Sequence, residues 1–450
     1  MISVLINTQH SFVVYITNST ILIIEYMKIR NIITLYITRR SLCNALSMKT
    51  DVQEGDYVCV FKSFFSQKRF WGSLLGIVIV VMIFSIAFIG SIVNPTPEDL
   101  PVALVVNDKG AELPNKTKLN AGEQYKETLL DNKDIPFKWS VIDAREDAIS
   151  AMNEKKYYAT IVIPENMSQQ ILSLQSPSPQ KPEVEVIINQ GMHYTAANTT
   201  KQVIDQLLSK INGQIQDNIY TQLETNKATI TPSQAKLLSS PLLVKNETVN
   251  EVGDHTANGN APVLFTQIIW IAVIISSVIH FVIMKKVTNG CISIRSILAQ
   301  LVAGLLFATA IASTVLLFTD NVLNVNISDF QATFLFLLFT AFMFYLLQNA
   351  ILNWLGLAGV PLFILLFLFS IPVLNLPPEF LPTVTQDWFY SWVPFKYSVE
   401  GLRNIFYFGG HDIQSYLFVL GMIGVASFII MSLSILKTTS KEKTMVAVEK

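Results

Sequence analysis

The chain has 450 residues, of which 51% are hydrophobic and only 14% are charged, and its formal net charge is -1. Soluble domains carry about 25% charged residues, so this composition predicts a membrane protein. The small net charge, without a basic stripe interleaved with aromatic residues, gives no support to a nucleic-acid partner.

The first 59 residues form a leader that differs from the rest of the chain. Residues 1–48 hold short apolar patches broken by charged residues, and none of these patches reaches the length of a membrane span. They also lack the single apolar core and the cleavage site of a secretory signal. Two interpretations stay open. In the first, the leader is an interfacial or marginal span. In the second, it is a gene-start error and the native chain begins near Val60, because the codons of Gln53-Glu54-Gly55-Asp56 just before it can resemble a ribosome-binding site.

Five apolar regions after the leader reach the length of about 20 residues that a helix needs to cross a bilayer. The fourth region is about twice as long as one span requires and is interrupted by Gln348, Asn349, Asn353 and Gly356, so we expect two helices joined by a tight turn. The prediction is six transmembrane helices, arranged as one plus five. The regions are Trp71–Val93, Val263–Met284, Ile297–Phe318, Phe330–Leu374 and Tyr416–Leu436.

Basic residues in the flanks of these spans predict their orientation, because cationic flanks tend to stay in the cytoplasm. Such residues precede the first span, separate the second from the third and follow the last, whereas the loop 319–329 has no Lys or Arg. We therefore expect a multi-pass protein of a bacterial cell membrane with both termini cytoplasmic. The predicted parts are an amphipathic elbow and first span (60–93), an extracellular domain (94–262), a five-helix domain (263–436) and a cytoplasmic tail (437–450).

The segment 94–262 alternates between the periodicity of strands and that of helices, which predicts an α/β domain with a small sheet. We expect Asp143 to cap the first of the predicted helices together with Glu146, and the last, long helix to run toward the membrane. The segment has no Gly-rich phosphate loop, HExxH, GxSxG or CxxC motif, and His193 and His255 are each expected at the surface. No enzyme activity, cofactor or metal is therefore expected. The predicted strands are 102–107, 139–142, 157–163 and 184–189, and the predicted helices are 144–155, 166–174 and one spanning 203–223.

Two local sequences resemble the permeases of type-two ABC exporters, in particular the YhgE/Pip, or phage infection protein, branch. One is AISAM at 148–152 followed by KKYYATIVIPE at 155–165, and the other is WVPFKYSVEGLR at 392–403. The order of an elbow, one span, a large external α/β domain and five more spans is also similar to that family. The resemblance implies a permease, and it implies that the loop with Lys285, Lys286 and Arg295 contacts an ATPase, although this loop is short.

Polar side chains within the predicted spans are candidates for transport or for helix packing, because they cost free energy unless they face protein or water. Gln348, Asn349 and Asn353 fit a polar turn better than a transport site, whereas Gln300 is expected to bond between helices. Glu400 and Arg403 pair on one face if their segment is a re-entrant helix, and otherwise they form a solvated pair. The complete set is His280, Gln300, Gln348, Asn349, Asn353, Glu400 and Arg403.

The chain lacks a G-x-x-x-x-G-K-[ST] sequence, so ATP-driven transport requires a separate ATPase subunit. Our first hypothesis is a permease, homodimeric or paired, that sits in the lipid bilayer and exports a hydrophobic or amphipathic substrate such as a lipid, drug or toxic compound. The second is a surface-exposed protein whose external domain binds a partner in phage adsorption or secretion-complex assembly. ATP-independent efflux is a third.

Overall fold

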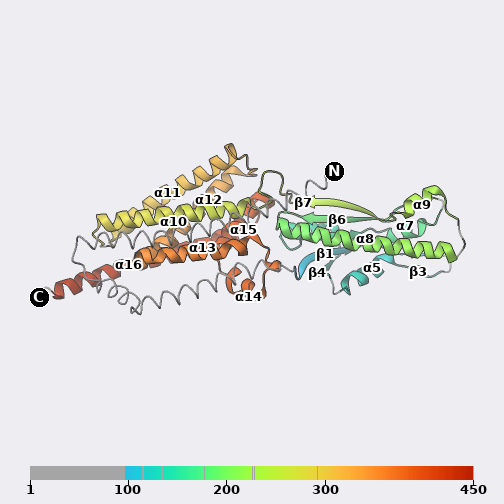
Figure 1. The fold of residues 1–450 in the computed structure, drawn as a ribbon, viewed down its shortest axis with the longest axis horizontal. Helices are drawn as coiled ribbons and strands as arrows, with labels where there is room; N and C mark the ends of the chain where they lie inside the picture. Colours follow the sequence, from blue (N-terminus) through green and yellow to red (C-terminus); the bar gives the residue numbers. More distant parts are fainter. Residues whose placement is uncertain are drawn as a thin grey trace, which may run out of the picture. The chain divides into compact units, whose positions relative to one another are not determined.

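The computed structural model of the chain describes residues 97–448, except for 114–115, 133–134, 177, 226, 228 and 291. The predicted leader, the elbow and the first span Trp71–Val93 lie outside the described residues. Within the described part, an α/β region is followed along the chain by a helical region that begins at Ala261 (Figure 1).

The α/β region is built on a five-stranded mixed sheet with the strand order β4-β1-β5-β6-β7. Strand β1 is parallel to both β4 and β5, and β6 is parallel to β7, whereas β5 and β6 are antiparallel. Val102 of β1 therefore lies between Trp139 of β4 and Ala159 of β5. The strands are β1 (Leu100–Val106), β4 (Phe137–Ile142), β5 (Ala159–Ile163), β6 (Glu183–Asn189) and β7 (Leu243–Val249), and β2 (Ala111–Glu112) pairs with β3 (Lys118–Leu119) in a separate small sheet.

Helices cover both faces of the large sheet. Successive side chains of a strand point to opposite faces, so each face has its own apolar side chains, which the helices bury. On β1, Val102 and Leu104 join the apolar core that includes the inner face of the long helix α8, whereas Ala103 and Val105 join the core of α6 on the other face. Figure 1 shows α8 running along the sheet. The helices are α5 (Ala121–Leu130), α6 (Arg145–Asn153), α7 (Met167–Ser173), α8 (Tyr194–Thr225) and α9 (Pro232–Leu238).

Four segments of the described chain are long and apolar enough to cross a membrane. One of them, Phe330–Asn375, consists of two helices joined by a 3₁₀ turn at Gly356–Gly359. The predicted division of residues 330–374 is therefore confirmed. The helices are α10 (Ala261–Val287), α11 (Ile294–Asn321), α12 (Phe330–Leu355), α13 (Val360–Asn375) and α16 (Ile413–Val448), of which Ile413–Lys437 is the apolar part.

The helix α15 (Pro394–Phe408) lies between α13 and α16 in the chain and is buried among the other helices. The ring of Trp270 on α10 joins three of these helices, with its centroid 5.0 Å from that of Phe344 on α12 and 4.6 Å from that of Phe395 on α15. Its Nε1 also donates a hydrogen bond to the carbonyl of Phe363 on α13, at 3.3 Å. Edge-to-face contacts of this kind add to the free energy gained by burial. Short turns η3 (Pro378–Phe380), α14 (Thr383–Thr385) and η4 (Gln386–Tyr390) connect α13 to α15.

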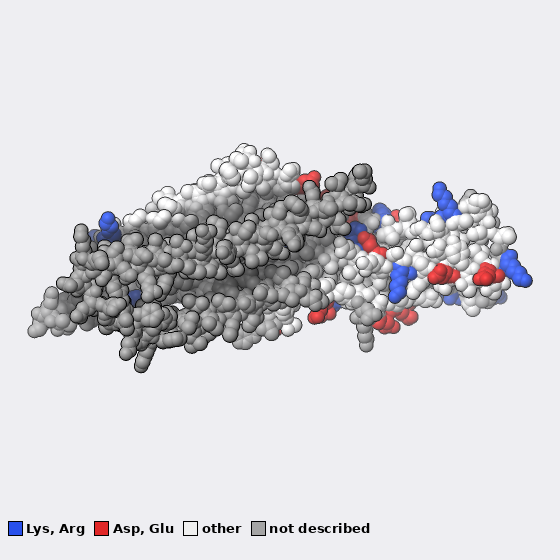
Figure 2. All heavy atoms as spheres, in the orientation of Figure 1, with Lys and Arg blue, Asp and Glu red and all other residues white. Residues whose placement is uncertain are grey.

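The described charged residues are distributed as expected for a membrane protein. On the face drawn in Figure 2, Lys, Arg, Asp and Glu are spread over the α/β region and appear at the ends of the helices, whereas the described helical surface between them is free of charge. Large apolar side chains are exposed on the described helices, among them Ile275 of α10 at 57% and Leu306 of α11 at 64%. Lipid tails solvate such a surface at no cost, and water does not.

Three details of the α/β region differ from the expectations. The N-cap of α6 is Ala144, which makes no side-chain capping bond, so the predicted caps Asp143 and Glu146 are wrong. The helix α8 is not the last element of the α/β region, as was expected of the long helix that runs toward the membrane, because α9 and β7 follow it. Strand β7 was not expected because it is an edge strand with mostly polar, exposed residues, and such a strand lacks the apolar alternation that identifies a half-buried one.

Candidate functional site

Helix α15 carries a buried ion pair. Glu400 and Arg403 are one helical turn apart, and Arg403 Nη1 donates to Glu400 Oε1 at 2.7 Å. The helix starts with Pro394, whose fixed φ suits a first turn, and ends at Gly409 in the left-handed conformation with φ 63°. The side chains of Arg403 and Glu400 are only 6% and 16% exposed. The predicted pairing on one face is therefore confirmed, and the solvated alternative is wrong.

The α/β region supplies a third member of this cluster. Lys155, which follows α6 at a positive φ of 60°, places its Nζ 3.3 Å from Glu400 Oε2 and 3.4 Å from the Glu400 carbonyl oxygen. The same ammonium donates to Tyr416 Oη at 3.3 Å and lies 5.0 Å from the ring centroid of Phe408. The carboxylate of Glu400 thus joins a cation from the α/β region to a cation of its own helix.

The charges of this cluster are mutually dependent. Burial alone would raise the pKa of the Glu400 carboxyl, but the positive charges of Lys155 and Arg403 and their hydrogen bonds lower it to about 2. Burial lowers the pKa of the Lys155 ammonium, and the charge of Glu400 opposes that shift. A buried charge that loses its partner is costly, so separating Glu400 from either cation is unfavourable while the groups stay buried.

A second polar contact joins the two regions beside this cluster. Tyr158 on the α/β side donates its hydroxyl proton to Glu379 Oε2 at 2.9 Å, and the carbonyl of Glu379 accepts from the backbone N–H of Glu98 at 3.1 Å. Burial raises the pKa of Glu379. Since Tyr158 and Lys155 both belong to the KKYYATIVIPE sequence, this short stretch provides both contacts.

His193 is a buried histidine and not the expected surface residue. It immediately precedes α8, is 3% exposed, and neither of its ring nitrogens has a hydrogen-bond partner among the described residues. Burial and then the charge of Arg403 lower its pKa well below the ordinary value, while Glu400 opposes the shift. The histidine is therefore neutral at pH 7. His255, by contrast, is exposed, as predicted.

Four of the candidate polar residues of the helical region, His280, Gln300, Asn349 and Asn353, form bonds between helices. Gln300 on α11 and Asn353 on α12 exchange two amide hydrogen bonds, each 3.1 Å long, which confirms the role expected for Gln300. His280 Nδ1 lies 2.9 Å from the hydroxyl of Tyr345, and Asn349 Nδ2 donates to Ser277 Oγ at 3.1 Å. Both pairs join α10 to α12.

The interpretation of Gln348, Asn349 and Asn353 as a polar turn is wrong. All three lie within α12, and the turn follows at Gly356–Gly359. Gln348 is fully buried, and its amide makes no hydrogen bond among the described residues. The three residues occur in the last turns of a long helix, where polar side chains next to a glycine resemble the start of a loop.

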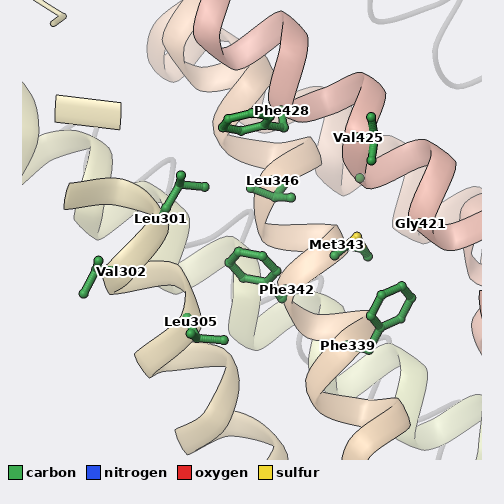
Figure 3. Close-up of a pocket in the computed structure, with 11 residues that line it drawn as sticks. Leu301, Val302, Leu305, Phe339, Phe342, Met343, Leu346, Gly421, Val425 and Phe428 are labelled. Carbon is green, nitrogen blue, oxygen red and sulfur yellow. The ribbon is translucent and has the colours of Figure 1, made fainter. Parts of the chain in front are cut away.

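An apolar pocket of about 510 Å³ opens between α11, α12 and α16 (Figure 3). No charged or amide side chain lines it. Gly424 allows α16 to approach α12 closely, because a Cβ at that position would lie 1.9 Å from Met343 Sδ. Val302 is 61% exposed at the edge of the pocket. The lining residues are Leu301, Val302, Leu305, Phe339, Phe342, Met343, Leu346, Gly421, Gly424, Val425 and Phe428.

The three basic residues expected to contact an ATPase lie around the connection between α10 and α11. Lys285 and Lys286 occupy the last turn of α10, where positive charge interacts favourably with the helix dipole, and Arg295 lies in the first turn of α11. All three are exposed. Serine residues 293 and 296 form a capping box that begins α11.

The four apolar segments, the polar contacts between their helices and the preceding α/β region define a multi-pass membrane protein with a folded domain outside the helical bundle. The chain belongs to the ABC-2 family of transporter proteins, whose sequence profile matches residues 68–436. It is similar to an uncharacterized protein of Bacillus subtilis (strain 168), YhgE, with 26% identity over 165 residues. This confirms the resemblance to that branch. The match covers 36% of this chain and 21% of YhgE, so the chain spans only part of the length of that relative.

One solved structure also matches, a domain of a putative ABC type-2 transporter from Thermotoga maritima MSB8. The sequence identity is 22%, the match covers 33% of this chain and 84% of that domain, and the TM-score is 0.24.

Proposed function

We propose that the chain is the membrane-spanning component of an ABC-type export system and that it moves a hydrophobic or amphipathic substrate such as a lipid, a drug or a toxic compound. Membership of the ABC-2 family supports a transporter component, and such a component works with an ATPase. Because the chain has no P-loop sequence, a separate subunit would hydrolyse ATP, and the chain itself would have no enzymatic activity.

The apolar pocket between α11, α12 and α16 is the observation that carries the choice of substrate class. Its volume of about 510 Å³ lies within the range of about 300–1,000 Å³ of pockets that hold small molecules. A charged solute entering it would lose its hydration and find no compensating partner, whereas an acyl chain or an aromatic ring would lose nothing. Figure 3 shows Phe342 and Phe428 extending toward this space from α12 and α16.

The proposal includes the topology that the basic flanks indicate. In it six helices cross the membrane, both termini are cytoplasmic, residues 94–262 are extracellular, and two permease chains pair, either as a homodimer or with a related subunit. Lys285, Lys286 and Arg295 would then face the cytoplasm and the ATPase. Labelling of single cysteines introduced on α8 and beside Arg295 with a membrane-impermeant reagent tests this arrangement, since only the α8 position should react in intact cells.

The pocket is tested by filling it. We expect Val302→Trp to reduce efflux of rhodamine 6G or of an NBD-labelled phospholipid from cells that express the chain with its ATPase. Leu298→Trp is the matched control, because Leu298 lies one turn earlier on α11, is similarly exposed at 56%, and does not line the pocket. Equal efflux in the two variants would contradict a role of the pocket in transport.

Two further results bear on the function as a whole. Co-purification of the chain with an ATPase is expected, and efflux that persists after the ATP supply is removed would instead support ATP-independent transport. Deleting residues 107–250 distinguishes the second hypothesis, in which the external domain binds a phage or a secretion partner. Loss of partner binding with unchanged efflux in the deletion variant would overturn the export proposal.

A further inference from the structure

A smaller pocket of about 260 Å³ opens at the end of the helices that is remote from the α/β region. Helix α10 leaves the α/β region at Ala261 and extends over 27 residues, so its last turn lies about 40 Å along the helix axis from its start. The pocket is formed by this last turn of α10, the connection to α11, the end of α12 and Lys437 of α16. It is distinct from the apolar pocket, with which it shares no lining residue.

Two lysines from different helices line this pocket, Lys285 of α10 and Lys437 of α16, and no Asp or Glu does. Lys437 Nζ donates one hydrogen bond to the carbonyl of Trp354, which positions the ammonium and leaves two of its N–H groups free of that bond. The Lys285 ammonium has no ion-pair or hydrogen-bond partner in the described part of the chain. Two cations that share a pocket without a counter-ion attract an anion. On the face drawn in Figure 2, basic atoms and no acidic ones are visible at this end of the described helices.

Besides the lysines, the wall combines the polar residues Thr288 and Asn353 with apolar side chains. Phe281 and Met284 of α10 and Leu352 and Leu355 of α12 line the pocket beside the two lysines. Trp354, at the same level, is 38% exposed, as is typical of tryptophans at the boundary between hydrocarbon and headgroups. The pocket therefore offers positive charge and apolar surface together. A free phosphate ion would use only the positive charge, and an acidic protein segment would leave the apolar wall uncovered.

We propose that this pocket binds the phosphate of an anionic phospholipid headgroup, with Lys285 and Lys437 as its two cationic ligands and the upper part of an acyl chain against the apolar wall. The volume fits a headgroup fragment and is too small for a whole lipid, so the remaining chain would lie in the bilayer. Pockets that combine basic residues with the ends of transmembrane helices suit such headgroups. The bound lipid would join α10, α12 and α16, and the site is independent of the exported substrate.

The test uses the purified full chain in nanodiscs of phosphatidylcholine, to which phosphatidylglycerol with the same acyl chains is added. We expect phosphatidylglycerol to raise the melting temperature and to be retained in native mass spectrometry. Replacing both lysines, in K285Q/K437Q, should weaken the apparent affinity for this lipid by about 30-fold. The matched control is K286Q, since Lys286 is the exposed neighbour that does not line the pocket, and this variant should bind as the wild type does.

Several outcomes would overturn the proposal. One is an equal rise in melting temperature when further phosphatidylcholine is added in place of phosphatidylglycerol. Another is an equal loss of phosphatidylglycerol binding in K286Q. A third is an equal rise in melting temperature with inorganic phosphate, which would make the pocket a site for free anions. A K285Q/K437Q variant that binds phosphatidylglycerol normally but no longer co-purifies with an ATPase would assign the lysines to an acidic protein segment. The K285R/K437R variant retains both charges and should retain the lipid-dependent shift. Loss of the shift in that variant would also overturn the proposal.

Discussion

Lys155 of the α/β region and Glu400 of α15 form an ion pair across 245 residues of sequence, with Nζ 3.3 Å from Oε2 and side chains only 14% and 16% exposed. Because Arg403 pairs with the other carboxylate oxygen, Glu400 forms ion pairs with two cations that come from different parts of the fold. The arrangement makes the position of α15 depend on that of the α/β region. A displacement of α15 relative to the α/β region would separate Lys155 from Glu400 and leave the buried Lys155 charge unpaired.

Replacing Lys155 should therefore destabilise the protein far more than replacing its neighbour. We expect Lys155→Met to lower the free energy of unfolding by about 1.5–3 kcal/mol, because Glu400 loses one charged hydrogen-bond partner and keeps only Arg403. Lys156→Met is the matched control, since the Lys156 side chain is 60% exposed and pairs with the exposed Glu154. Melting curves of the purified proteins in detergent provide the comparison.

A double-mutant cycle separates the ion pair from other effects of the substitution. Combining Lys155→Met with Glu400→Gln should cost less than the sum of the two single changes, because Lys155→Met removes one of the two buried cations that Glu400→Gln leaves unpaired. Additive losses would show that Lys155 contributes through its contacts with Phe408 and Tyr416 alone.

Close packing of α15 against α12 gives a second prediction. A Cβ at Gly401 would lie 2.2 Å from Phe336 Cζ, whereas nothing lies within 4 Å of the corresponding position at Gly213 in the middle of α8. Gly401→Ala should therefore destabilise the protein by about 1–3 kcal/mol through overpacking. Gly213→Ala should stabilise it by up to about 1 kcal/mol, since alanine favours the helix and the site is open. Melting temperatures that shift in the same direction for both variants would contradict this packing.

The origin of these contacts explains how far the sequence alone can predict them. Glu400 and Arg403 are three residues apart, so a helix brings them together whatever surrounds it, and their pairing was predictable. Lys155 reaches them only through the tertiary fold, and nothing in its local pattern identifies the partner. Two tyrosines and a buried strand that follow shortly after this lysine were the one available signal.

The other predictions divide in the same way, because local chain geometry decides some features and tertiary contacts decide the rest. The span between residues 330 and 374 divides where helix geometry requires, at Gly356, whose φ is 64° and thus in the left-handed region. The burial of Gln348, by contrast, depends on which helices surround α12, and the burial of His193 depends on the contact between the α/β and helical regions. Periodicity reports which face of an element is apolar, but it does not report the few polar residues that neighbouring elements enclose.

His193 makes the stability depend on pH in a defined direction. Its pKa is lowered well below 6.5 in the folded protein, because burial and the charge of Arg403 oppose its protonation, so the unfolded chain binds more protons as the pH falls through 6.5. The free energy of unfolding should therefore decrease toward acidic pH, by up to about 1.4 kcal/mol per pH unit below 6.5.

The His193→Phe variant should lose this part of the pH dependence while its stability at pH 7.5 stays close to that of the wild type. This is because the ring nitrogens of His193 have no hydrogen-bond partner to lose among the described residues. Melting temperatures measured between pH 5 and 7.5 give the difference between the two proteins, in which other titrating groups such as Glu379 cancel. His255→Asn removes an exposed histidine at a position of positive φ that asparagine accepts, and it controls for the loss of a histidine as such. A difference between wild type and His193→Phe that does not vary with pH would contradict the prediction, because it would show that His193 has the same pKa in the folded and unfolded states and that the charge of Glu400 offsets the burial of the ring and the charge of Arg403.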